Sequence, residues 1–123
     1  DLSPVPDPLQ GTRWDVINYN NGRGALVTLI ADSYITVDFG ADGQVSGNAG
    51  CNNYFTSYQV NGDNITIGQP GSTALYCAEP EGGMEQEAEF LAALQTAVTF
   101  RIDGNTLEIR SADQIAVIAN RLP

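Results

Sequence analysis

The chain contains no histidine and no lysine, and its cationic side chains are five arginines. Without an imidazole it lacks the general base of serine and cysteine triads and the commonest general acid–base catalyst. Paired carboxylates act alone in glycosidases, but most acidic residues here fall in predicted turns or at solvent-facing strand positions, where charge is expected anyway. We therefore expect a protein that is not an enzyme and that holds no cofactor and no metal ion.

Long apolar runs are also missing: none reaches the roughly 18 residues that a membrane-spanning helix needs, and residues 1–8 do not have the pattern of a signal peptide. Instead, residues 1–8 contain three prolines, which predicts a stiff, extended leader or linker. Such a leader is typical of chain that follows a removed signal peptide or lipid-anchor segment, or that joins two domains. We expect one domain over residues 9–121, monomeric and either secreted or exposed in the cell envelope.

Basic charge is scarce, since fifteen acidic residues against five basic ones give a net charge of −10. This charge repels phosphate backbones, so we expect no nucleic acid partner. The same charge would either solubilise the protein or steer it toward a basic surface on a protein partner. Charge alone does not separate these two roles.

Five of the six glutamates are concentrated between residues 79 and 89. The candidate residues of a weak cation site in this acidic corner are Glu79, Glu81 and Glu85. No segment, however, has the regular spacing of oxygen ligands that defines a calcium loop. A solvated acidic face is the favoured interpretation.

Cysteine is scarce as well, with Cys51 and Cys77 the two in the chain. They are consistent with a disulfide, a pair of buried thiols or two metal ligands, although the absence of histidine removes most zinc arrangements. We favour the disulfide, which would persist only in an oxidising compartment. It would close a loop of about 27 residues and contribute roughly 3–4 kcal/mol to the stability of the domain.

Most of the remaining sequence alternates apolar and polar residues in short stretches separated by glycine-containing turns, the pattern of antiparallel strands. Trp14 and Val16, for example, fall on one face of the first predicted strand, which ends at the turn dipeptide Asn21-Gly22. The predicted strands cover residues 12–20, 25–30, 35–39, a stretch around residue 45, 54–60, 65–67, 73–77, 98–102, 107–109 and 115–119.

One segment departs from this alternation. Between residues 84 and 97 apolar side chains recur at spacings of three and four, which predicts a single amphipathic helix. Its predicted apolar face consists of Met84, Ala88, Phe90, Leu91, Leu94 and Val98. Because the connections are too short for parallel crossovers, we expect a mainly β fold, an antiparallel barrel of about 8–10 strands with the helix inserted before the last strands.

Residues 47–54, with the sequence GNAGCNNY, are too particular for generic strand chemistry. Further motifs are LxGTxW over residues 9–14, TxxxC over residues 73–77 and MExExxFLxxL over residues 84–94. With these motifs the chain resembles the META domain, also called the HslJ-like family, over about residues 9–120. Cys51 and Cys77 both lie inside the matching motifs, so the resemblance implies that these two cysteines form a pair.

This resemblance implies a compact β-barrel-like domain with one helix, found in bacterial envelope and secreted proteins that are often lipoproteins. It implies no enzyme activity. Members have been linked to heat-shock and stress responses, antibiotic resistance, secretion and virulence, but no shared molecular function follows. The motif residues look structural in this family.

The leading functional hypothesis is a non-enzymatic protein-binding module of the envelope or secretome, with protease inhibition as one concrete version. Its candidate partner-binding residues are Tyr19, Asn21, Tyr54 and Tyr76. An alternative is the binding of a lipid or small apolar ligand inside the barrel. The predicted lining of that interior includes Trp14, Phe39, Phe55 and Phe100. A third hypothesis is a purely structural or stress-protective role.

Overall fold

Ten antiparallel strands and one α-helix make up the regular structure of the described residues, 8–31, 33–78 and 80–122, of this computed structural model. The strands are β1 (Arg13–Asn20), β2 (Leu26–Thr28), β3 (Thr36–Phe39), β4 (Gln44–Asn48), β5 (Asn53–Asn61), β6 (Asn64–Ile67), β7 (Gly71–Ser72), β8 (Thr99–Asp103), β9 (Thr106–Arg110) and β10 (Ile115–Arg121). The helix, α1 (Gly83–Gln95), lies between β7 and β8 in the chain, as predicted.

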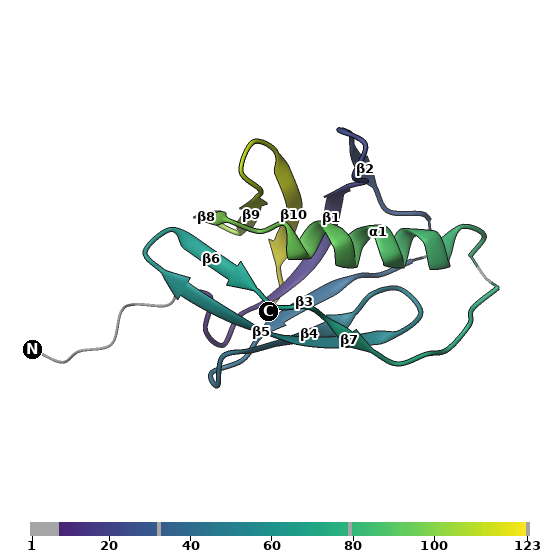
Figure 1. Cartoon of the computed structure of the whole chain (residues 1–123), viewed down its shortest axis with the longest axis horizontal. Helices are drawn as coiled ribbons and strands as arrows, with labels where there is room; N and C mark the ends of the chain where they lie inside the picture. Colours follow the sequence, from purple (N-terminus) through teal and green to yellow (C-terminus); the bar gives the residue numbers. More distant parts are fainter. Residues whose placement is uncertain (1–7, 32, 79, 123) are drawn as a thin grey trace, which may run out of the picture.

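Pairing between β1 and β10 closes eight of the strands into a barrel, in the order β1-β3-β4-β5-β6-β8-β9-β10 (Figure 1). Strand β2 pairs with β1, and β7 pairs with β5, outside this closed circuit. Closure gives each of the eight strands a neighbour on both sides. It confirms the predicted antiparallel barrel. The β6–β8 joint is the shortest, since its register contains one pair, Asn64 with Thr99.

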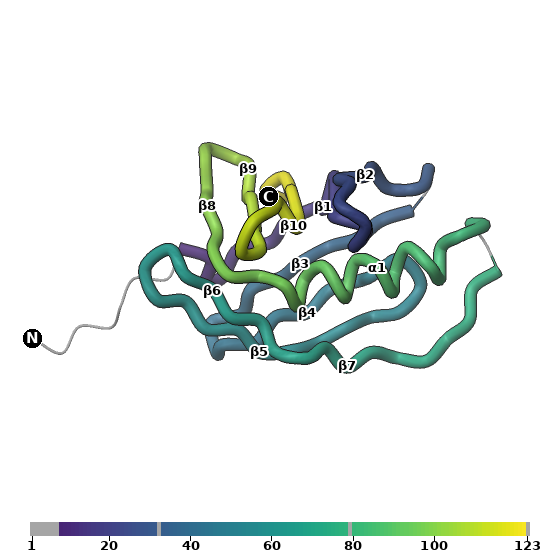
Figure 2. Tube along the Cα trace, turned by 45° about the horizontal axis from the view of Figure 1, so that its top comes forward, coloured from purple at the N-terminus to yellow at the C-terminus, as the bar shows by residue number. Residues whose placement is uncertain are grey.

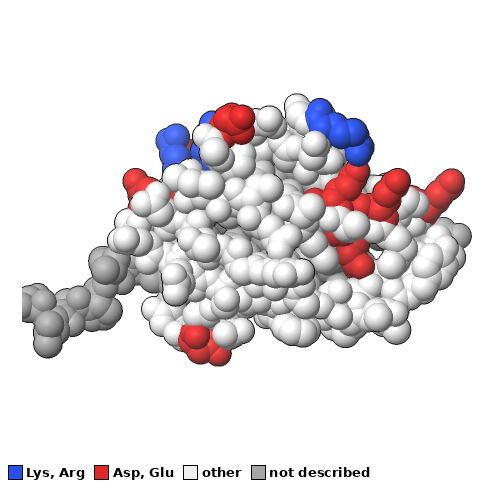
Figure 3. Space-filling model, in the orientation of Figure 1, with Lys and Arg blue, Asp and Glu red and all other residues white. Residues whose placement is uncertain are grey.

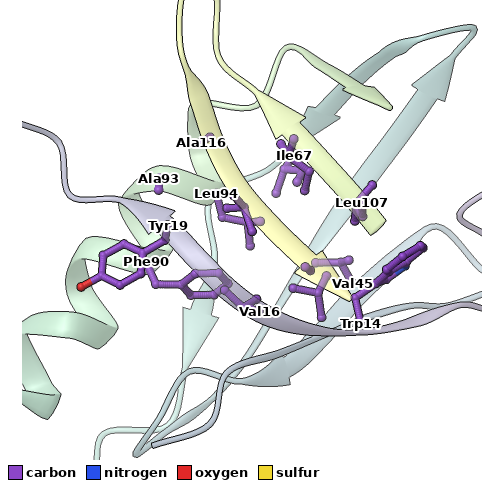
Figure 4. Packing of buried hydrophobic residues seen from close by; sticks show 14 of the residues in the cluster. Trp14, Val16, Tyr19, Val45, Ile67, Phe90, Ala93, Leu94, Leu107 and Ala116 are labelled. Carbon is purple, nitrogen blue, oxygen red and sulfur yellow. The ribbon is translucent and has the colours of Figure 1, made fainter. Parts of the chain in front are cut away.

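Large side chains from the strands and from α1 fill the interior of the barrel (Figure 4). Trp14 of β1, Phe39 of β3 and Phe90 of α1 are at most 1% exposed. The ring of Tyr54 meets Phe90 edge-on at 5.7 Å between centroids, and Phe39 meets Tyr58 in the same way at 4.9 Å. Such edge-to-face pairs add to the burial of apolar surface, so the interior is a packed core.

Phe55 corrects the predicted lining of the barrel. Strand β5 turns Tyr54, Thr56 and Tyr58 inward, and the period of two therefore points Phe55 outward, where it is 58% exposed. Its ring lies over Gly71 of β7, where an added Cβ would come within 2.8 Å of it. The other predicted lining residues, Trp14, Phe39 and Phe100, are buried.

The glycine that begins the GNAGCNNY motif permits a close approach between β4 and β3. A Cβ on Gly47 would lie 2.1 Å from the carbonyl oxygen of Thr36. The same carbonyl accepts a hydrogen bond from the Tyr54 hydroxyl at 2.7 Å, and the Thr36 hydroxyl accepts one from the backbone N–H of Asn48 at 3.0 Å. The motif thus fixes the geometry of three neighbouring strands.

The buried face of α1 differs from the predicted one. Its buried residues are Gln86, Glu87, Phe90, Ala93 and Leu94, whereas Ala88 and Val98 are exposed. Figure 2 shows α1 running between the β1–β2 hairpin and the chain that follows β7. At the end of the barrel where α1 begins, loops present backbone N–H groups to the first turns of the helix. Buried N–H groups need hydrogen-bond acceptors. Polar side chains therefore occupy the inner face of these turns.

The chain after β7 is extended without being a strand, which corrects the strand predicted over residues 73–77. The N–H of Thr73 still donates to the carbonyl of Asn53 at 3.0 Å. Asn53 is the first residue of β5, so the ladder between β5 and this segment stops at Thr73. The strand predicted over residues 25–30 is likewise shorter, because β2 spans Leu26–Thr28.

Candidate functional site

A disulfide joins Cys51, in the loop between β4 and β5, to Cys77, in the extended chain that leads to α1. The Cα atoms of the two residues are 5.9 Å apart. The bond confirms the predicted pairing and leaves no free cysteine in the described residues. It ties two loops together at the end of the barrel where α1 begins.

Asn52, beside the disulfide, is 3% exposed and holds the extended chain with its side chain. Its Oδ1 accepts hydrogen bonds from the N–H of Leu75 and the hydroxyl of Thr73, both at 2.7 Å. Its Nδ2 donates to the carbonyl of Leu75 at 3.0 Å. One amide therefore pairs with both backbone groups of Leu75, as a neighbouring strand would.

Glu87 holds this loop from the helix. The side chain is buried, and its Oε1 accepts hydrogen bonds from the N–H groups of Asn52 at 2.7 Å and Cys51 at 3.2 Å. Its Oε2 accepts one from Asn52 Nδ2 at 2.8 Å. Hydrogen bonds to a charged acceptor are the stronger kind. Glu87 therefore fixes the position of Asn52, and through it that of Leu75.

Gln86, the residue before Glu87, holds a second loop, the connection between β2 and β3, by hydrogen bonds from its side chain. Its Oε1 accepts a hydrogen bond from the N–H of Ile30 at 2.8 Å, and its Nε2 donates to the Ser33 hydroxyl at 3.0 Å. The predicted site residues do not include Gln86, Glu87 or Asn52. A signal for the first two exists, because they precede Phe90 by four and three positions and so share its helix face.

On the outer side of this end, large apolar side chains face solvent. Leu75 is 63% exposed and Tyr76 81% exposed, while Tyr34, in the connection between β2 and β3, is 72% exposed. The backbone beneath Leu75 is braced by Asn52, and the residue after Tyr76 is in the disulfide. The structure thus presents exposed apolar side chains on a restrained, extended backbone.

Of the four predicted partner-binding residues, Tyr76 is the most exposed. Tyr19 and Tyr54 are buried and correct the prediction, because both occupy inward-facing positions of their strands and are not available to a partner. The Tyr19 hydroxyl donates to Glu89 Oε1 at 3.0 Å. Asn21 lies in the β1–β2 turn, where its Oδ1 accepts a hydrogen bond from the N–H of Arg23 at 2.8 Å. These three residues serve the fold.

Comparison with known proteins identifies the family. The sequence model described as META domain matches residues 7–121, almost the whole chain. The chain belongs to the META domain family. No curated protein shows significant sequence similarity to it.

Solved structures share the fold of this META domain. A protein from Burkholderia xenovorans, determined by NMR, is 20% identical with a TM-score of 0.74, over 99% of this chain and 94% of that one. A second NMR structure is 21% identical with a TM-score of 0.66, over 96% of each chain. A DUF4847 family protein from Bacteroides vulgatus is 16% identical with a TM-score of 0.61, over 93% of this chain and 94% of that one. At these identities the likeness concerns the fold.

Acidic side chains of the META domain gather over the first turns of α1 (Figure 3). Of the predicted cation corner, Glu81 and Glu85 are exposed, and Glu79 lies outside the described residues. Within the described ranges, no three acidic or cysteine side chains come close enough together to hold a metal ion. The cation site stays a prediction.

The described residues also contain no helix long and apolar enough to cross a membrane.

Burial of the Tyr19 hydroxyl, with its hydrogen bond to Glu89 and the charge of that carboxylate, raises the pKa of Tyr19 to about 12. An unfolded tyrosine ionises near 10. The folded chain therefore retains a proton that the unfolded chain releases, and this contribution to stability is complete below pH 10 and lost as the pH rises through 12.

We expect the free energy of unfolding to fall between pH 10 and pH 12, and Tyr19→Phe to reduce this fall by up to about 1.4 kcal/mol per pH unit. Urea unfolding of the wild type and of Tyr19→Phe at pH 8 and pH 11 measures this fall in the free energy of unfolding. Burial also raises the pKa of Tyr54, so some of the fall is expected to persist in the variant. A Tyr19→Phe variant with the full wild-type slope would contradict the assignment.

Proposed function

We propose that this META domain is a non-enzymatic, exported protein-binding module, and that it acts as a substrate-like inhibitor of a peptidase through the segment Thr73–Cys77. One observation carries the proposal: the buried amide of Asn52 holds both backbone groups of Leu75, while the side chains of Leu75 and Tyr76 face solvent. A disulfide is compatible with a location outside the cytoplasm, where it persists.

The conformation of this segment suits a peptidase cleft. In an extended chain the N–H and C=O groups of successive residues point to opposite sides. Because both groups of Leu75 point inward to Asn52, those of Ala74 and Tyr76 point away from the domain. A cleft that binds peptides as an added strand would pair with these outward groups. Prior ordering of the segment lowers the entropic cost of binding.

The same contacts would resist loss of the segment after cleavage. Of the bonds in this segment, we assign Tyr76–Cys77 as the one presented to the peptidase, since Tyr76 is its most exposed side chain. If that bond were cut, Asn52 would still hold Leu75 on one side and Cys51 would hold Cys77 on the other. The new ends would remain together, which favours rejoining over release.

The test exchanges the side chain that would enter the specificity pocket. We expect the oxidised protein to inhibit chymotrypsin, whose pocket is apolar, competitively against a chromogenic peptide. Tyr76→Arg should weaken this inhibition by about 100-fold and create inhibition of trypsin, whose pocket is acidic. The matched control is Tyr34→Arg, which alters another highly exposed tyrosine, on a different loop, and should change neither inhibition constant.

Two results would refute the proposal. One is inhibition that Tyr76→Arg leaves unchanged. The other is rapid cleavage after Tyr76, followed by loss of inhibition at the same rate, which is the behaviour of an ordinary substrate. Mass spectrometry of the mixture during the assay distinguishes an intact complex from released fragments.

A further inference from the structure

Three of the five arginines line one groove, although the chain as a whole carries a net charge of −10. The groove has a volume of about 620 Å³. Its arginines are Arg101, Arg110 and Arg121, and Asp63 is its one acidic residue among the described lining residues. It includes the β5–β6 turn, which Figure 1 shows at the opposite end of the barrel from the start of α1. The groove is therefore separate from the segment Thr73–Cys77.

The groove follows the short joint between β6 and β8. The N–H of Phe100 donates to the carbonyl of Asp63 at 3.0 Å, next to the single register pair of these strands. Beyond it, residues 101–103 of β8 pair with β9 and not with β6. Phe100, which is buried, and Ile102, which is partly buried, give the groove an apolar surface.

The three arginines differ in their partners. Arg110 is paired with Glu108 at 2.7 Å, and Arg101 lies 3.8 Å from Asp103. The guanidinium of Arg121 lies 4.6 Å from the centre of the Trp14 ring and has no ion pair with any carboxylate in the described part of the chain. Stacking on an aromatic ring orients a guanidinium and leaves its N–H donors available.

We propose that this groove binds a single-chain amphiphilic carboxylate of the fatty-acid class. Its carboxylate pairs with Arg121, since guanidinium and carboxylate match as a two-pronged hydrogen-bonding pair. Its hydrocarbon chain lies on Phe100 and Ile102. Charge complementarity and the apolar surface favour this ligand, because a bare anion would leave the apolar surface wet and a neutral hydrocarbon would leave the guanidinium unpaired.

The sole tryptophan provides the measurement, since Trp14 contacts Arg121. We expect octanoate, decanoate and dodecanoate, each below its micelle concentration, to change the Trp14 fluorescence saturably. Affinity should rise about two- to fourfold for each added methylene. Arg121→Gln should weaken decanoate binding at least about tenfold. Arg23→Gln is the matched control, because Arg23 lies in the β1–β2 turn and pairs with Glu89. This variant should bind decanoate as the wild type does.

Ligand controls on the unaltered protein keep the proposal falsifiable if Arg121→Gln misfolds. Acetate should bind far more weakly than decanoate, and decyltrimethylammonium, of equal chain length and opposite charge, should not bind at this site. Equal affinities for acetate and decanoate would overturn the proposal in favour of a bare-anion site. Equal binding of the cationic amphiphile, or no saturable change with any carboxylate, would also overturn it.

Discussion

Replacing Glu87 by alanine is expected to lower the free energy of unfolding by about 3–5 kcal/mol. The buried carboxylate accepts three hydrogen bonds, two from Asn52 and one from Cys51. Alanine would leave these donors without an acceptor in a site that side chains largely close to water, and each unsatisfied donor costs about 1–3 kcal/mol. Urea unfolding measures the change as a lower midpoint at an unchanged slope.

The control for this prediction is Glu85→Ala, which removes an exposed carboxylate from the same helix two positions earlier. We expect its effect to stay within about 0.5 kcal/mol. Glu87→Gln keeps the shape of the side chain but turns one acceptor into a donor that meets other donors, so its effect should lie between those of the two alanine variants. Equal losses for Glu85→Ala and Glu87→Ala would mean that the hydrogen bonds of Glu87 contribute little.

Glu87 also shows where sequence patterns stop being informative. The strands could be predicted because period-two alternation and glycine turns are local properties of the chain. The inner face of α1 could not, because the partners of Gln86 and Glu87 include backbone N–H groups of Ile30, Cys51 and Asn52, which are far away in sequence. A pattern search that treats buried helix positions as apolar assigns such residues to solvent.

The tyrosines illustrate a second limit. The predicted strands, 12–20 and 54–60, already contain Tyr19 and Tyr54, so the error concerns which way these side chains point. In β1 the register shifts between Val16 and Asn18, which breaks the alternation set by Trp14 and Val16 and turns Tyr19 inward. Tyr54 takes the first inward position of β5. Tyr76 lies in the chain between β7 and α1, and its predicted exposure agrees with the structure. For the candidate site, the sequence could predict the disulfide and Tyr76, but not the buried residues that brace them.

Those buried residues connect the fold to the proposed function. Asn52 is held by Glu87, and Leu75 is held by Asn52. The conformation of the exposed segment therefore depends on the first turns of α1. A protein that must hold one loop rigid for binding gains from such a chain of contacts, because rigidity before binding reduces the entropy lost on binding.

Removing the disulfide with the double substitution Cys51→Ala/Cys77→Ala is expected to lower the free energy of unfolding by about 3–4 kcal/mol. The bond joins residues 26 positions apart, and in the chain-entropy account it acts mainly by restricting the unfolded chain. Urea unfolding of the double variant, of the oxidised wild type and of the wild type in reductant measures the effect. The variant and the reduced protein should unfold at the same midpoint.

Glu87 and the disulfide act on the same loop through different states, and this difference can be measured. The hydrogen bonds of Glu87 stabilise the folded loop, whereas the disulfide limits the freedom of the unfolded chain. If that division holds, Glu87→Ala should speed hydrogen exchange at the N–H of Leu75 even in the oxidised protein. In the Cys51→Ala/Cys77→Ala variant, the same N–H should exchange more slowly than in Glu87→Ala. Faster exchange in the cysteine variant would mean that the disulfide, rather than the Glu87–Asn52 contacts, orders the exposed segment.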